Sequence, residues 1–258
     1  MKILLTFFVT FFAGMGAGLG TGFAGMSAAA VISPMLITFL GMEPYMAVGI
    51  ALSSDVLASA VSAYTYKKNG NLDVKNGLIM MVSVLVFTVV GSWVSSLVPS
   101  TTMGTFSVFM TFLLGIKFIV RPVMTTKEAM QGVSAKKRAI QSVVCGIFIG
   151  FICGFVGAGG GMMMLLILTS VLGYELKTAV GTSVFIMAFT AFTGAVSHFA
   201  IGGAPDWTAW ILCVIFTLLW ARIAAVFANK ATPKTLNRVT GVILVILGIV
   251  VMAFSMFA

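Results

Sequence analysis

Charged side chains are scarce in this sequence. Only 8% of its 258 residues are charged and 60% are hydrophobic, whereas a soluble globular protein carries about 25% charged residues. Uncharged stretches long enough to cross a hydrocarbon core of roughly 30 Å recur along the chain, at 3–42, 76–116, 139–174, 178–197 and 239–258. The composition excludes a soluble domain and predicts an all-α integral membrane protein with several spans.

Histidine, cysteine and paired acidic residues are also few, which limits the chemistry available to the chain. The one histidine and three cysteines show no CxxC or Cys/His spacing, so neither a metal site nor a disulfide is indicated. An intramembrane enzyme would need a nucleophile with its base or an HExxH-type ligand set, and a nucleotide-driven pump would need a GxxxxGK[ST] loop. We therefore expect no enzymatic activity, no cofactor and no bound metal.

The chain is a tandem duplication. A shift of 132 residues aligns Gly22 with Gly154, Gly25 with Gly157, and the Leu-Gly-x-Glu motif ending at Glu43 with a second one ending at 175. The first repeat covers residues 1–121, a cytoplasmic linker covers 122–137, and the second repeat covers 138–258. Each repeat contains five apolar segments, at 3–22, 26–40, 45–66, 76–97 and 102–120, then at 138–155, 159–173, 178–199, 207–228 and 236–257.

Basic residues predict how the repeats lie in the membrane. They concentrate in the loops 67–75, 121–138 and 230–238, which belong in the cytoplasm because positively charged loops stay inside. This explains the net charge of +9 without a nucleic-acid partner. An odd number of crossings per repeat satisfies all three loops, so the repeats are inverted and both termini lie outside. Charge does not decide whether the first two segments of each repeat both span the membrane or form a re-entrant pair.

Glycine is concentrated at 20–34 and at 154–161, two short stretches that lie inside uncharged runs of membrane length. Glycine permits close helix packing, but a helix broken within the membrane also frees backbone N–H groups, which attract anions and need a cavity or protein cover. Because the two runs are related by the duplication, we favour substrate-binding breaks of the kind found in secondary transporters. The candidate residues are Gly22, Gly25, Ser27, Gly157, Gly159, Gly160 and Gly161.

Hydroxyl groups in the third segment of each repeat are further candidates. Ser53 and Ser54 in the first repeat, and Thr182 and Ser183 in the second, could donate hydrogen bonds to an oxyanion. The alternative is that each hydroxyl bonds to the preceding turn of its own helix.

Asp55 is an acidic residue in the middle of the segment 45–66, where a carboxylate is expensive and marks an ion path, a proton relay or a partnered structural site. We expect it to couple protons to transport; the structural alternative is a hydrogen bond from Ser53 or Ser59. Its repeat partner is Met187, so its role occurs once per chain. His198 is either a polar tip at the membrane interface or a second proton-transfer residue.

The stretches "GFAGMSAAAVISPML…LGMEPYMAVGIALSSDVLASA" and "GFVGAGGGMMMLLIL…LGYELKTAVGTSVFIMAFTAF" resemble the TauE/SafE sulfite-exporter family, also described as 4-toluene sulfonate uptake permeases. The resemblance covers essentially the whole chain. It implies transport of small sulfur-containing anions, such as sulfite or organosulfonates, across the bacterial inner membrane. The first repeat departs from the pattern, because it has Met26-Ser27-Ala28 in place of the second repeat's Ala158-Gly159-Gly160.

We therefore interpret the chain as a secondary transporter, an exporter or permease, of a small sulfur-containing anion, with protons as coupling ions and the lipid bilayer as its surroundings. Two alternatives stay open: an anion channel whose pore is lined by the same breaks, and a cation carrier that uses Asp55. The sequence also leaves open whether the chain forms a homo-oligomer.

Overall fold

The computed structural model describes residues 2–95, 112–113, 115–156, 160–202 and 204–257. The described chain consists of helices and short connections, which confirms the predicted all-α class. The helices are α1 (Lys2–Ala24), α2 (Ala29–Leu40), α3 (Pro44–Lys68), α4 (Val74–Ser95), α6 (Lys127–Gln131), α7 (Ala135–Val156), α8 (Gly160–Ser170), α9 (Leu176–Gly202), α10 (Trp207–Lys230) and α11 (Pro233–Phe257).

Within the described residues, six helices are long and apolar enough to cross a membrane. They are α1, α3, α4, α9, α10 and α11. By contrast, α2 has 12 residues and α8 has 11, which at about 1.5 Å per residue gives roughly 17–18 Å, little more than half of a core of about 30 Å. The chain is thus a multi-pass membrane protein in which the second segment of each repeat is too short to span.

Side-chain caps and backbone turns set where these helices begin and end. Glu43 accepts a hydrogen bond from the backbone N–H of Met46 at the start of α3, and Pro44 occupies the first turn, where its missing N–H costs nothing. Asp206 caps α10 in the same way. Gly41 ends α2 with a φ of 60°, a conformation that glycine adopts without strain.

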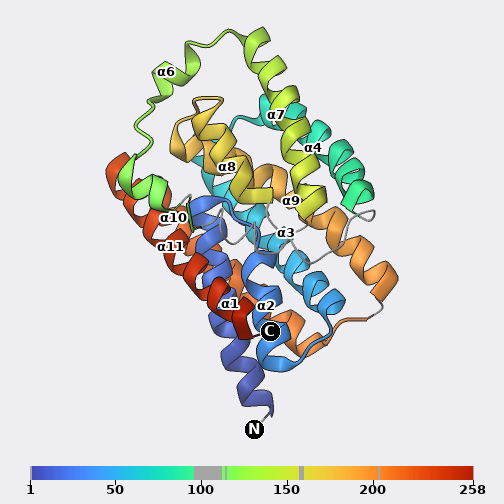
Figure 1. Cartoon of the computed structure of the whole chain (residues 1–258). Coiled ribbons are helices and arrows are strands. Elements are labelled where there is room, and N and C mark those ends of the chain that lie inside the picture. The colour runs from blue at the N-terminus through green and yellow to red at the C-terminus, as the bar shows by residue number, and fades with distance from the viewer. Residues whose placement is uncertain (1, 96–111, 114, 157–159, 203, 258) are drawn as a thin grey trace.

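The connections gather at two opposite ends of the bundle (Figure 1). At the end that carries α6, the Lys127 ammonium donates to the carbonyl of Gly70 (3.0 Å) and the Asn71 side chain donates to Asn229 (2.6 Å), so three basic connections lie together. Tyr174, in the connection after α8, donates to Asp73 at the same end.

The other end brings together the start of α1 and the end of α2. Leu5, Thr6, Leu40, Glu43 and Asp206 line a common pocket there. The connection at 41–43 therefore lies at the opposite end from its repeat equivalent at 173–175. This is the arrangement that an inverted duplication predicts, and the inversion itself stays a prediction.

Each repeat contributes helices that pack against the other repeat. In the first pair, α1 lies along α10, with Gly14, Gly18 and Gly22 facing Phe216, Thr217 and Ala224. In the equivalent second pair, α7 lies along α4 through Gly146 and Gly150. Between these pairs, α3 packs on α9. Small residues every fourth position allow this close approach, so packing is one answer to the glycine content of α1.

Replacing Gly18 by alanine tests the α1–α10 contact. A Cβ there would lie 2.6 Å from the Thr217 carbonyl oxygen and 2.8 Å from Trp220 Cβ, so the helices must separate. We expect overpacking to cost about 1–3 kcal/mol, and the melting temperature in detergent to fall by several degrees. Gly132→Ala is the matched control, since its Cβ would meet nothing closer than 3.6 Å. Equal melting temperatures for the two variants would contradict the close packing.

Cysteine labelling tests the two-ended arrangement. With the three native cysteines replaced by alanine, single cysteines are introduced at Met42 and Val171, one in each connection. We expect an impermeant thiol reagent to label one of them in intact cells and the other only after the membrane is opened. A third cysteine at Asn69 should behave as the one at 171 does. Labelling of 42 and 171 from the same side would refute the arrangement.

Candidate functional site

The helical backbone is interrupted between the end of α1 at Ala24 and the start of α2 at Ala29, where a glycine-rich break was predicted. Gly25 has a φ of 61° and turns the backbone out of helical geometry after Ala24. Side chains from other helices bond the carbonyls that the helix end leaves without partners: Tyr66 donates to Gly22 O (2.9 Å) and Thr240 donates to Phe23 O (3.2 Å). Backbone groups in a membrane interior must be bonded within the protein. These two hydrogen bonds therefore make the break compatible with a position inside the membrane.

A carboxylate from α3 lies at the beginning of α2. Asp55 is fully buried, and its oxygens accept hydrogen bonds from the Ser27 hydroxyl (2.8 Å), the Ala28 N–H (3.1 Å) and the Ser59 hydroxyl (2.8 Å). A negative charge at a helix start is favourable, because the N–H groups there carry partial positive charge. The structure therefore brings Asp55 and Ser27 together, and it confirms Ser59 as a bonding partner.

The two predicted breaks meet in the interior. The hydroxyl of Ser183, on α9, lies 3.2 Å from the carbonyl oxygen of Gly25 and 3.4 Å from that of Gly161. A Cβ on Gly161 would overlap the Gly25 carbonyl oxygen, so only glycine permits this approach. Ser183 therefore bridges residues from both repeats at the point where the two opened segments touch.

The second break is described at its edges. Helix α7 ends at Val156 and α8 begins at Gly160, while Gly157 and Gly159, two of the predicted site residues, lie outside the described residues. The Met187 sulfur lies 3.2 Å from the Cβ position of Gly161, in the first turn of α8. Met187 therefore lies beside the start of α8, as its repeat partner Asp55 lies beside the start of α2.

Other predicted site residues have different bonding or packing partners. The Ser54 hydroxyl bonds to Ile50 O in its own helix, and Ser53 does so while accepting from the Trp210 indole N–H (2.6 Å). Thr182 accepts from the backbone N–H of Asp73 (3.2 Å), in the connection between α3 and α4. Gly22 packs on α10. His198 belongs to α9, and its side chain lies outside the described part.

One polar cluster near the basic connections was missed by the sequence reasoning. Tyr174 donates to Asp73 (2.8 Å), and the Arg138 guanidinium lies over the Tyr174 ring at 4.9 Å. Burial, together with the negative charge of Asp73, raises the pKa of Tyr174 above its ordinary value, so the phenol keeps its proton and acts as the donor. No local motif reveals this cluster, because Asp73 and Tyr174 are 101 residues apart in the sequence and Arg138 lies far from both.

Comparison with known proteins places the chain in a family. The family model described as "Sulfite exporter TauE/SafE" matches residues 10–251. The chain belongs to the TauE/SafE family. This agrees with the resemblance stated from the sequence, and it makes the chain a membrane transporter.

Curated relatives of this TauE/SafE protein carry the same general description. The probable membrane transporter protein YunE of Bacillus subtilis is 25% identical over 244 residues, which covers 87% of this chain and 89% of the relative. A probable membrane transporter protein of Haemophilus influenzae is 26% identical and covers 91% of this chain and 86% of the relative. No solved structure matches the chain.

Substitution of Asp55 tests its contribution to the break. Leucine would leave the Ser27 and Ser59 hydroxyls and the Ala28 N–H without their acceptor, at a cost of about 1–3 kcal/mol for each buried group. We expect Asp55→Leu to lower the melting temperature sharply and Asp55→Asn to lower it less, since the amide oxygen still accepts. Ser54→Ala, which leaves these bonds intact and removes a hydroxyl that donates to the Ile50 carbonyl of its own helix, serves as control. Equal stability of Asp55→Leu and wild type would refute this role.

Proposed function

We propose that this TauE/SafE protein is a secondary transporter that moves a small sulfur-containing anion, such as sulfite or an organosulfonate, across the bacterial inner membrane. The observation that carries the proposal is the Asp55 carboxylate at the start of α2. It supports the proposal because a broken helix start in this chain already bonds a carboxyl group, and a sulfite or sulfonate group presents similar oxygen acceptors.

The second break supplies the place for a transported anion in this proposal. The shift of 132 residues puts Met187 in the place of Asp55, Gly159 in that of Ser27 and Ala191 in that of Ser59. The second repeat thus replaces the carboxylate and both of its hydroxyl partners by groups without charge or O–H. The substrate's oxygens would bond to the N–H groups of Gly160 and Gly161 and to Ser183, whose hydroxyl turns from its two long bonds.

Asp55 provides the coupling in the same proposal. Its carboxylate and the substrate are both negative, and the low-dielectric interior makes it costly to hold both charges close together. Protonation of Asp55 removes one of these charges and weakens the hydrogen bond that its carboxylate accepts from the Ala28 N–H. The anion therefore binds together with a proton. The basic connections lie in the cytoplasm and the termini outside, following the positive-inside rule.

The test is a flux measurement in liposomes. Purified protein is reconstituted, a pH gradient is imposed, and uptake of labelled sulfite and of a panel of sulfonates is followed. We expect saturable uptake of at least one of these anions that depends on the gradient. Asp55→Asn should reduce the gradient-dependent part at least about tenfold, and Glu128→Gln, an exposed carboxylate of the linker, should leave it unchanged.

The other outcomes separate the alternatives. A channel would be indicated by uptake that does not saturate with substrate concentration and that is not stimulated by unlabelled substrate on the opposite side of the membrane. Uptake of a cation that is lost in Asp55→Asn would indicate the cation carrier. Saturable anion uptake that persists in the mutant would leave the transporter but remove Asp55 from the coupling, and absence of flux for every sulfur anion would refute the substrate class.

A further inference from the structure

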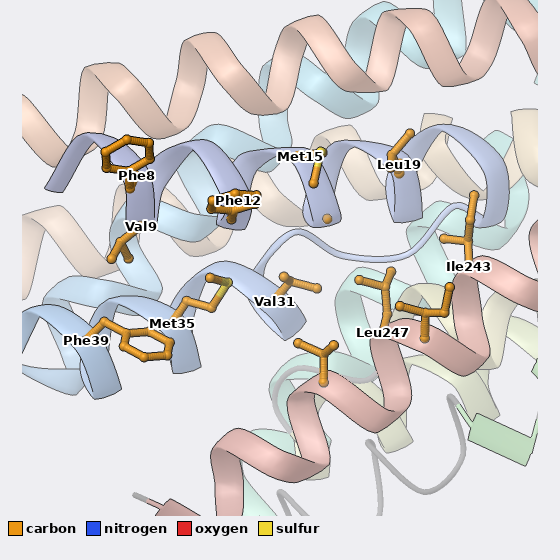
Figure 2. A pocket seen from close by; sticks show the side chains of 13 residues that line it. Phe8, Val9, Phe12, Met15, Leu19, Val31, Met35, Phe39, Ile243 and Leu247 are labelled. Atoms are coloured by element: carbon orange, nitrogen blue, oxygen red, sulfur yellow. The ribbon is translucent and has the colours of Figure 1, made fainter. Parts of the chain in front are cut away.

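An apolar groove runs along the surface between α1, α2 and α11 (Figure 2). It encloses about 500 Å³, and the described residues that line it are all apolar. Phe8 and Phe12 form its half-exposed rim, while Val9, Val31 and Leu247 are buried in its floor. Figure 2 shows the labelled side chains of α1 along the top of the view, with those of α2 below at the left and those of α11 below at the right.

The groove opens away from the other packed helices. Gly241 and Gly248 of α11 contact Gly115 and Phe112, whereas Ile243, Ile246 and Val250 of α11 line the groove. At 100° per residue these two sets lie on opposite sides of the helix. Among the described residues, the groove therefore opens on the side of α11 that faces away from Gly115 and Phe112, and we expect this side to face lipid.

The length of the groove matches one leaflet. Its lining on α1 extends from Phe8 to Leu19, which is 11 residues of helix, or about 16 Å at 1.5 Å per residue. Half of a hydrocarbon core of roughly 30 Å is about 15 Å. The groove thus has the length of one acyl chain lying along the membrane normal.

A polar pocket adjoins the groove at Phe39, which lines both. This pocket of about 300 Å³ contains the carboxylates of Glu43 and Asp206. Each carboxylate uses one oxygen to cap its helix, through the N–H of Met46 and of Ala209 respectively. The pocket therefore presents two negative charges on a chain whose net charge is +9, and it favours a positively charged group.

We propose that the groove binds one acyl chain of a phospholipid with an ammonium head group, and that Glu43 and Asp206 bind the ammonium. The apolar groove matches an acyl chain in length and character, and the two carboxylates at its end match a positively charged head group. A single phospholipid carries both of these parts. Because the floor residue Leu247 contacts Gly20 and Gly20 contacts Met26 in the break, a bound acyl chain also supports the packing around the opened segment. This site is independent of which anion is transported.

Lipid retention on the purified protein tests the proposal. Full-length protein in a mild detergent is incubated with an equal mixture of phosphatidylethanolamine and phosphatidylglycerol, delipidated stepwise, and analysed by native mass spectrometry. We expect one phosphatidylethanolamine per chain to persist, with at least a tenfold preference over phosphatidylglycerol. Glu43→Gln combined with Asp206→Asn should abolish the preference while both helix caps persist, because the amide oxygens still accept.

Control variants separate the groove from general effects. Met15→Trp fills the groove and should remove the retained lipid, whereas Leu219→Trp, an exposed position on α10, should not. Glu175→Gln, the repeat partner of Glu43 at the opposite end, should keep the head-group preference. Equal retention of the two lipids, or retention unchanged by Met15→Trp, overturns the proposal. Dimers that Met15→Trp dissociates would also overturn it, since a second copy would then fill the groove.

Discussion

The structure depends on the need to bond every backbone polar group inside a membrane. Once the helix opens after Ala24, its free carbonyls and N–H groups must find partners within the protein. Tyr66, Thr240 and Asp55 meet this need from two other helices. The positions of α3 and α11 around α1 and α2 follow from these bonds, so the break organises the surrounding bundle as well as interrupting it.

The chemistry at the start of α2 differs from the chemistry at the start of α8. The two repeats place equivalent elements around the centre, and Ser183 bridges Gly25 and Gly161 where those elements meet. Only the first repeat supplies a carboxylate with two hydroxyl partners, because Met187 takes the place of Asp55. The start of α2 thus bonds a carboxylate of the chain itself, whereas Met187 lies beside the start of α8.

Glycine serves two separate purposes in these membrane helices. Gly14, Gly18 and Gly22 let α1 lie directly on α10, as close packing requires, whereas Gly25 turns the chain at positive φ and Gly161 admits a carbonyl oxygen from the other repeat. Close packing and a helix break therefore both occur in α1 and just after it, at different residues, and substrate binding at the break stays a prediction. The spacing of glycines in the sequence distinguishes these two roles only in part. A glycine four residues after another can be the last packing contact of a helix or the first residue of a break.

The sequence by itself determined the membrane class, the family and the break after α1, because each rests on composition or on local order along the chain. The same local order predicts the duplication and a second break within 154–161. It also singled out Asp55, since an acidic residue deep in an apolar segment is conspicuous. Only the tertiary structure decided that Asp55 bonds to Ser27 and Ala28 at the start of α2, that Ser183 joins both breaks while Ser53 and Thr182 do not, and that α2 and α8 stop short of a full span. These facts depend on how helices from the two repeats pack, and side-chain partners that lie 28 or 158 residues apart leave no pattern in the linear sequence.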